Sequence, residues 1–260
     1  MKSILKYILK NGLRDRLYLG LFISIAVAFA VSIFLGTTML VEQNQSSIVY
    51  SLATTRTILS IGMILFVCIN LNRAFENKEI EFILSKSISR EKFVLAYLAG
   101  FFIANFLILL PITTLIYLIF PINKLGILFW FLTTLSENLI VISFALLSSL
   151  ILKNSFSAIL ASFGFYAISR LMGMFVMAID VPEDYNSVTQ GGLASALKIL
   201  SILFPRLDLF AQSSWGIYGV KDNVVLLIIF FQSIIYLPLM IFMAFHDFKK
   251  KKFYILSGSL

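Results

Sequence analysis

The sequence is poor in the residues that build most metal and disulfide sites. Its 260 residues include one cysteine, Cys68, and one histidine, His246. A single cysteine excludes an intramolecular disulfide and any zinc site built from cysteines. His246 stands beside Asp247 with no second ligand in view, and a lone histidine is a poor metal site. We therefore expect no cofactor bound to this chain itself.

Charged residues are scarce as well. They make up 13% of the chain, whereas an ordinary soluble domain carries about 25%. Hydrophobic residues make up 60%, and the mean hydropathy is +0.96. A soluble core of this length cannot hide so much apolar surface, and a disordered chain would not contain it. The composition predicts an all-α membrane protein that crosses the bilayer several times.

Six apolar runs are long enough to cross a bilayer, which needs roughly 20 residues of helix. We interpret them as transmembrane helices of one domain, residues 1–260: 17–41, 52–71, 93–120, 125–152, 156–179 and 224–245. Arg56 interrupts the second run near its outer end. Pro111 and Pro238 lie inside the third and sixth runs, where membrane helices tolerate proline as a kink.

Lysine and arginine divide unevenly between the two sides of this arrangement. One side carries 15 of the 21: those of the arm 1–16, the segment 72–92, the hairpin between the fourth and fifth spans and the C-terminus. The other side carries five, Arg56 among them. The positive-inside rule then predicts cytoplasmic termini in a multi-pass protein of the cell membrane. The net charge of +8 follows from this bias, so we expect the lipid bilayer and not nucleic acid as a partner.

The arm 1–16 has the pattern of an amphipathic helix. Its apolar stripe is flanked by lysines, with the stripe formed by Ile4, Leu5, Ile8 and Leu9 and the flanks by Lys2, Lys6 and Lys10. Such a helix lies on the inner leaflet, attracted by anionic lipid. The segment 180–222 is predicted to be external, with a short interfacial or re-entrant helix over 193–204.

The segment 72–92 combines high charge with a short apolar pattern. Nine of its 21 residues are charged, yet Ile80, Ile83 and Leu84 recur at helical spacing. One interpretation is a short cytoplasmic helix whose apolar face enters a groove on a partner while its charges fix the register. The other is a solvated loop that serves only the positive-inside rule. The residues alone leave both open.

Three stretches resemble the permeases of type-2 ATP-binding-cassette exporters. KYILKNGLRDR (6–16) resembles the N-terminal elbow helix of that family. EIEFILSKSISREKF (79–93) resembles the signature after the second span, in which a run of leucine-leucine-serine-x-proline-isoleucine-serine-arginine follows an acidic helix; Ser87 stands where proline is usual. SILFPRLDLF (201–210) resembles the external segment before the last span.

The resemblance implies a permease subunit that works as a dimer with an identical or paralogous chain. Its coupling helix would dock on a separate ATP-binding-cassette ATPase, which would hold the ATP and Mg²⁺. The docking residues that it implies are Glu76, Glu79, Ile80, Ile83, Leu84 and Arg90. The chain has no GxxxxGK[ST] phosphate-binding loop, so nucleotide chemistry needs a partner.

Glu137 and Arg170 are charged residues inside predicted spans. Glu137 lies sixteen residues before Lys153, and Arg170 sixteen after Asn154, in two helices joined by a hairpin. At ~1.5 Å per residue both lie about 24 Å from the hairpin. An unpaired charge at the bilayer centre costs at least ~2.5–3.5 kcal/mol, so we expect an ion pair. The pair either fixes the helix register or faces a translocation path.

Other classes of function fit the sequence less well. A membrane enzyme needs a nucleophile and base or a metal constellation at membrane depth, and none is visible. A secondary transporter favours internal inverted repeats, and we find none. A non-transporting assembly or immunity protein with the same fold remains open. The transported substrate is not indicated.

Overall fold

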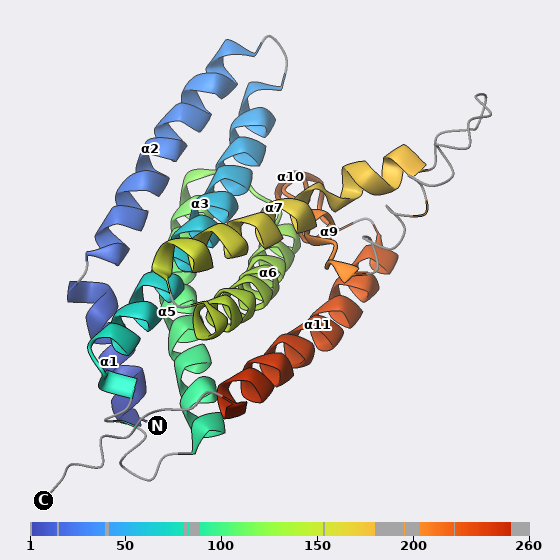
Figure 1. Cartoon of the computed structure of the whole chain (residues 1–260). Helices are drawn as coiled ribbons and strands as arrows, with labels where there is room; N and C mark the ends of the chain where they lie inside the picture. Colours follow the sequence, from blue (N-terminus) through green and yellow to red (C-terminus); the bar gives the residue numbers. More distant parts are fainter. Residues whose placement is uncertain are drawn as a thin grey trace, which may run out of the picture.

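The computed structural model describes residues 2–14, 16–39, 42–80, 83, 89–152, 154–179, 195, 203–220 and 222–250. Every element in these ranges is a helix (Figure 1). Six helices are long and apolar enough to cross a bilayer: α2 Leu17–Thr38, α3 Gln43–Glu76, α5 Arg90–Ile119, α6 Lys124–Ile151, α7 Ser155–Ile179 and α11 Asn223–Lys250. The prediction of an all-helical chain with six candidate spans is thereby confirmed.

The second span differs most from its predicted limits. The apolar run covers 52–71, but α3 is a single helix of 34 residues. Its first turns carry Gln43, Gln45 and Ser46, which belong to the hairpin between α2 and α3. Packing against α2 extends the helix beyond its apolar part. Arg56 therefore lies well inside α3 and not near its end.

The middle of the bundle is formed by α3, α5 and α6. In each of these three helices 61% of the most apolar stretch is buried, compared with 22% in α2, 28% in α7 and 11% in α11. Figure 1 shows α2 and α11 on opposite sides of the bundle. The outer helices thus leave large apolar surfaces exposed. A surrounding bilayer would cover such surfaces.

Polar side chains set where several helices begin. Asn123 Oδ1 accepts hydrogen bonds from the backbone N–H groups of Leu125 and Gly126, both at 3.0 Å. Ser89 Oγ accepts one from Lys92 N at 3.4 Å. These N-caps satisfy amide groups that have no partner within the helix. They begin α6 and α5 at the edge of the apolar runs, close to the predicted starts.

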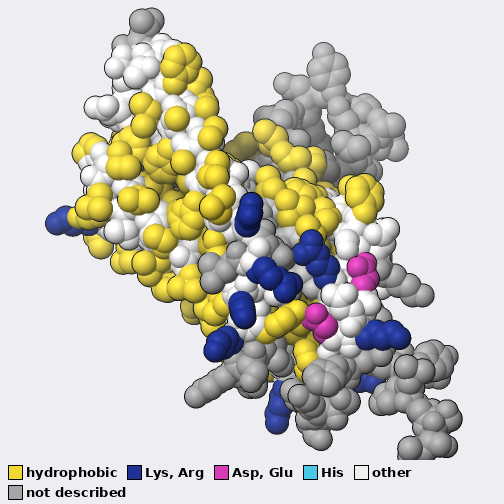
Figure 2. Space-filling model, turned by 90° about the vertical axis from the view of Figure 1, so that its left-hand side faces the viewer, with side chains coloured by type: hydrophobic (Ala, Val, Ile, Leu, Met, Phe, Trp, Pro, Cys, Tyr) yellow, Lys and Arg dark blue, Asp and Glu magenta, His cyan; other side chains and the backbone are white. Residues whose placement is uncertain are grey.

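The N-terminal helix α1, Lys2–Arg14, packs along α5. Ile8 is fully buried and lies so close to Gly100 that a Cβ there would stand 2.6 Å from Ile8 Cδ1. Lys6 and Lys10 are exposed on the other side. Figure 2 shows lysine and arginine gathered mainly on the lower part of one face, with apolar side chains above them. The position of α1 on a membrane surface stays a prediction.

Two one-turn helices, α9 Leu207–Phe210 and α10 Trp215–Tyr218, lie between α7 and α11. They fold back onto the bundle, α9 against α7 and α6, and α10 against α6 and α3. Gly126 allows the closest approach, because a Cβ there would lie 1.8 Å from the carbonyl oxygen of Trp215. Short helices before the last span were predicted; the one expected over 193–204 lies largely outside the described residues.

Candidate functional site

The predicted docking segment begins where α3 ends. Glu76 is the last residue of α3 and is exposed. Lys78 follows with φ of 56°, in the left-handed region, so the chain turns sharply there. Glu79, Ile80 and Ile83 are again helical, and Leu84 lies outside the described residues. Glu76 and Lys78 are both exposed at this corner of the bundle.

The described part of the segment is tied to α1. Tyr7 Oη donates a hydrogen bond to Glu79 Oε2 at 2.5 Å. Burial and the Glu79 carboxylate raise the pKa of the Tyr7 phenol, which therefore stays protonated as the donor. Ile80 is only 1% exposed and belongs to the core of this chain, and Ile83 packs partly against that core. The apolar side chains Ile80 and Ile83 thus pack against the chain's own helices here.

Arg90 connects the far end of the same segment to the last helix. Its Nη1 donates to the carbonyl oxygens of Phe248, at 2.9 Å, and Lys249, at 2.7 Å. Glu91 forms an ion pair with the Lys249 side chain. A guanidinium on the last carbonyls of α11 satisfies acceptors that a helix end leaves open and complements its dipole. Arg90 therefore contacts its own chain in this structure.

A buried charge cluster lies inside the bundle. Glu137 of α6 is fully buried, and the structure brings Arg170 of α7 to it, with Nη1 3.1 Å from Glu137 Oε1. Arg56 of α3 is also fully buried, and its Nη1 lies 3.4 Å from Glu137 Oε2. Arg56, which the count of basic residues assigned to the other side of the membrane, thus lies buried within α3 and not near its end. The expected pair is part of a triad that joins α3, α6 and α7.

Both arginines of this triad reach the backbone of α9. Arg56 Nη1 donates to Phe210 O, and Arg170 Nη1 donates to Leu207 O at 3.3 Å. Arg56 Nη2 also donates to Thr133 Oγ1 at 3.1 Å, and its guanidinium lies 5.5 Å from the centre of the Trp130 ring. The cluster therefore fastens α9 to three spans at once.

The triad carries two positive charges and one negative charge. Backbone carbonyl oxygens supply further negative potential, since Arg56 Nη2 also donates to Trp130 O at 3.2 Å. Burying ions is favourable only when their geometry and remaining hydrogen bonds compensate the lost hydration. Among the described residues no group of three His, Cys, Asp or Glu side chains could hold a metal ion. The contacts of Arg56 and Arg170 with Glu137 join α3, α7 and α6 and favour one register of the three helices.

A polar ladder extends the cluster across the bundle. Ser60 Oγ donates to Asn138 Oδ1 at 2.7 Å, and Asn138 Nδ2 donates to Asn105 Oδ1 at 3.1 Å. All three side chains are buried, and they come from α3, α6 and α5. Interhelical hydrogen bonds of this kind give membrane helices a defined register.

No model of a known protein family matches the chain, and no curated protein matches it significantly.

Proposed function

We propose that this chain is the membrane-spanning subunit of an exporter driven by a separate ATP-binding-cassette ATPase. Two permease chains, identical or paralogous, form the pathway, and ATP and Mg²⁺ bind to the ATPase. The observation that carries the proposal is the pair of ties on the segment after α3. Tyr7 of α1 bonds to Glu79 near its start, and Arg90 bonds to the end of α11.

These hydrogen bonds would transmit a movement of the segment to the rest of the bundle. A force on the segment acts on α3, which precedes it, on α5, which follows it, and on α1 and α11 through side chains. From Glu76 to Arg56 is twenty residues of continuous helix, about 30 Å at ~1.5 Å per residue. A shift of α3 therefore reaches the Arg56–Glu137 contact and, through Arg56, the backbone of α9. A motion driven at the Glu76 end of α3 thus acts on the middle part of the helix, where Arg56 lies.

The distribution of charge supports a cytoplasmic position for that segment. Exposed basic residues of α1, Lys6, Lys10 and Arg14, lie on the helix that bonds to Glu79. The positive-inside rule assigns such clusters to the cytoplasmic side, where an ATPase has access to ATP.

Co-purification from the native membrane tests the proposal, with any ATP-binding-cassette ATPase in the complex identified by mass spectrometry. Glu76 and Lys78 are exposed at the corner after α3, so the double reversal Glu76→Lys with Lys78→Glu changes docking charges without touching the core. We expect the ATPase to be lost from the complex. The matched control is Glu42→Lys, at the opposite end of α3, which should retain it. If the double reversal keeps the ATPase bound as well as the control does, docking at this corner is wrong.

A further inference from the structure

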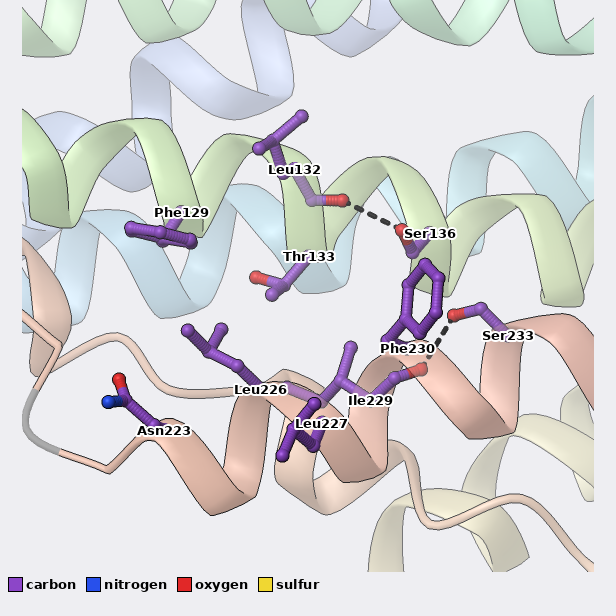
Figure 3. Close-up of a pocket in the computed structure, with 10 residues that line it drawn as sticks. All are labelled: Phe129, Leu132, Thr133, Ser136, Asn223, Leu226, Leu227, Ile229, Phe230 and Ser233. Carbon is purple, nitrogen blue, oxygen red and sulfur yellow. Dashed lines mark hydrogen bonds between the residues drawn. The ribbon is translucent and has the colours of Figure 1, made fainter.

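A groove runs between α6 and α11, with a cavity of about 520 Å³. Figure 3 shows the side chains of the two helices facing each other across it. It is lined by Phe129, Leu132, Thr133, Ser136, Asn223, Leu226, Leu227, Ile229, Phe230 and Ser233. This volume lies within the range of about 300–1,000 Å³ of small-molecule sites.

The lining favours hydrocarbon over a polar ligand. Ser136 Oγ donates to Leu132 O at 3.0 Å, and Ser233 Oγ donates to Ile229 O at 2.9 Å (Figure 3). Thr133 Oγ1 is occupied by Arg56. Among the described residues around the groove, none is charged. Away from Asn223 at the end of the groove, a polar or ionic group would lose its hydration without replacement hydrogen bonds, whereas an alkyl chain would lose none.

The length and position of the groove match one leaflet of a bilayer. Both α6 and α11 begin at the same end of the bundle, and the groove covers α11 from Asn223 to Ser233. Ten residues of helix measure about 15 Å, half of the ~30 Å hydrocarbon core. Leu227 and Phe230 are exposed on α11, 57% and 60% respectively, so the groove opens sideways toward lipid.

A second cavity of about 290 Å³ adjoins the start of α11. The residues lining it are Gln212, Ser214, Trp215, Tyr218, Gly219, Asp222 and Val225. The first turn of α11 and the residue before it border both cavities. Asp222 and Val225 line the second cavity, whereas Asn223 and Leu226 line the groove. An exposed carboxylate beside two aromatic rings attracts an ammonium ion, by charge and by cation–π interaction.

We propose that the two cavities form one binding site for a membrane lipid with an ammonium headgroup. One acyl chain lies in the groove between α6 and α11, and the ammonium group lies against Asp222, beside Trp215 and Tyr218. The apolar groove and the acidic aromatic cavity are complementary to the two ends of such a lipid. The site rests on these cavities and on the membrane-spanning helices, and it stands independently of the permease role.

Photo-labelling in nanodiscs tests the chain position. The full-length protein is placed in phosphatidylethanolamine discs that contain a trace of phosphatidylethanolamine with a diazirine on its acyl chain, and labelled peptides are mapped by mass spectrometry. We expect label to concentrate on α6 and α11 around Leu132 and Leu227. Leu227→Trp fills the groove and should reduce this label to the level on α2. The matched control, Ile33→Trp on the exposed face of α2, should leave it unchanged.

Exchange of the headgroup tests the second half of the site. In discs made of phosphatidylglycerol, added unlabelled phosphatidylethanolamine should compete with the photo-lipid better than the same amount of added phosphatidylglycerol does, and Asp222→Asn should weaken its competition by roughly two- to fivefold, the effect of one exposed ion pair. Glu42→Gln, an exposed acid before α3, serves as the control. Equal labelling of α2 and the groove, or cross-links from the groove to a second copy of the chain, would overturn the proposal. Equal competition by the two headgroups would overturn the ammonium assignment.

Discussion

Arg56 is the residue that most directly connects the parts of the molecule. It contacts Glu137 of α6, Thr133 and Trp130, which lie one and two turns earlier on α6, and Phe210 of α9. Because both Arg56 and Glu137 are fully buried, neither can turn to water if the other is removed. The stability of the bundle should therefore depend strongly on this contact.

We expect Arg56→Met to destabilise the protein by about 3–5 kcal/mol, the cost of leaving a buried charge with part of its pairing gone. Arg170→Met should cost less, because the Arg170 side chain is 24% exposed and Arg56 keeps its place on Glu137. The measurement is denaturant unfolding in mild detergent. Arg206→Met is the control: its pair with Asp208 is partly exposed, and it should cost at most about 1 kcal/mol. Equal losses for Arg56→Met and Arg206→Met would contradict the buried role.

A double-mutant cycle separates the pair from its surroundings. Glu137→Gln leaves two arginines without their carboxylate and should destabilise strongly, whereas Glu137→Gln combined with Arg56→Met should cost less than the sum of the single changes. A double variant that loses the full sum would show that Arg56 and Glu137 act independently.

At the residue scale the sequence predicts part of this cluster. Glu137 and Arg170 lie at equal distances from one hairpin, so counting residues is enough to place them at the same depth. The depth of Arg56 could not be predicted in this way. The apolar run begins at residue 52, close to Arg56, whereas the helix begins at Gln43. The carbonyls of Leu207 and Phe210 could not be predicted, since they depend on how α9 folds back. An arginine inside an apolar run is the signal that could have indicated a third partner.

At the scale of elements, α10 is held against α6 by a close backbone contact. A Cβ on Gly126 would lie 1.8 Å from Trp215 O, and backbone on both sides cannot move aside cheaply. We expect Gly126→Ala to destabilise the fold by about 1–3 kcal/mol through overpacking, measured as the shift in thermal unfolding. Gly164→Ala, on α7 with no atom within 4 Å of a Cβ, is the control and should be neutral or stabilising by up to about 1 kcal/mol. A tolerated Gly126→Ala would contradict the contact.

The tie between α1 and the segment after α3 gives an expectation of its own. Tyr7→Phe removes the donor to Glu79, a bond to a charged group that is worth about 1.5–3 kcal/mol when fully formed and less where it is partly exposed. Trypsin should then cleave faster after Lys78. Tyr117→Phe, on the exposed part of α5, should leave cleavage unchanged. An unaltered rate in Tyr7→Phe would show that α1 does not hold this segment.

The limits of the helices show what a hydropathy pattern can and cannot predict. The N-caps Ser89 and Asn123 stand just before the third and fourth apolar runs. The helices α5 and α6 therefore begin close to the first residues of those runs. At α3 the hairpin with α2 adds turns of polar residues, and at the end of α11 Arg90 satisfies the last carbonyls beyond the apolar part. Tertiary contacts, which the local pattern does not contain, determine these limits.

At the scale of the whole molecule, we propose that α3 transmits motion from one end of the bundle to its middle. The segment after α3 lies at one end, and the charge cluster with α9 lies about 30 Å away along the same helix. Large hydrophobic side chains are exposed on α2, α7 and α11, as expected of helices that could cross a bilayer. An ATPase that binds at Glu76 and Lys78 would indicate an ATP-driven permease. A corner that binds no ATPase would indicate a membrane protein that works alone.

Cross-linking in intact membranes tests that central claim most directly. A photo-reactive amino acid replaces Lys78 at the exposed corner or, in a second strain, Glu42 at the opposite end of α3. We expect the probe at position 78 to cross-link to an ATP-binding-cassette ATPase, identified by mass spectrometry, and the probe at position 42 to give no such cross-link. An equal yield from both positions, or no cross-link from position 78 with the ATPase present, would contradict the account.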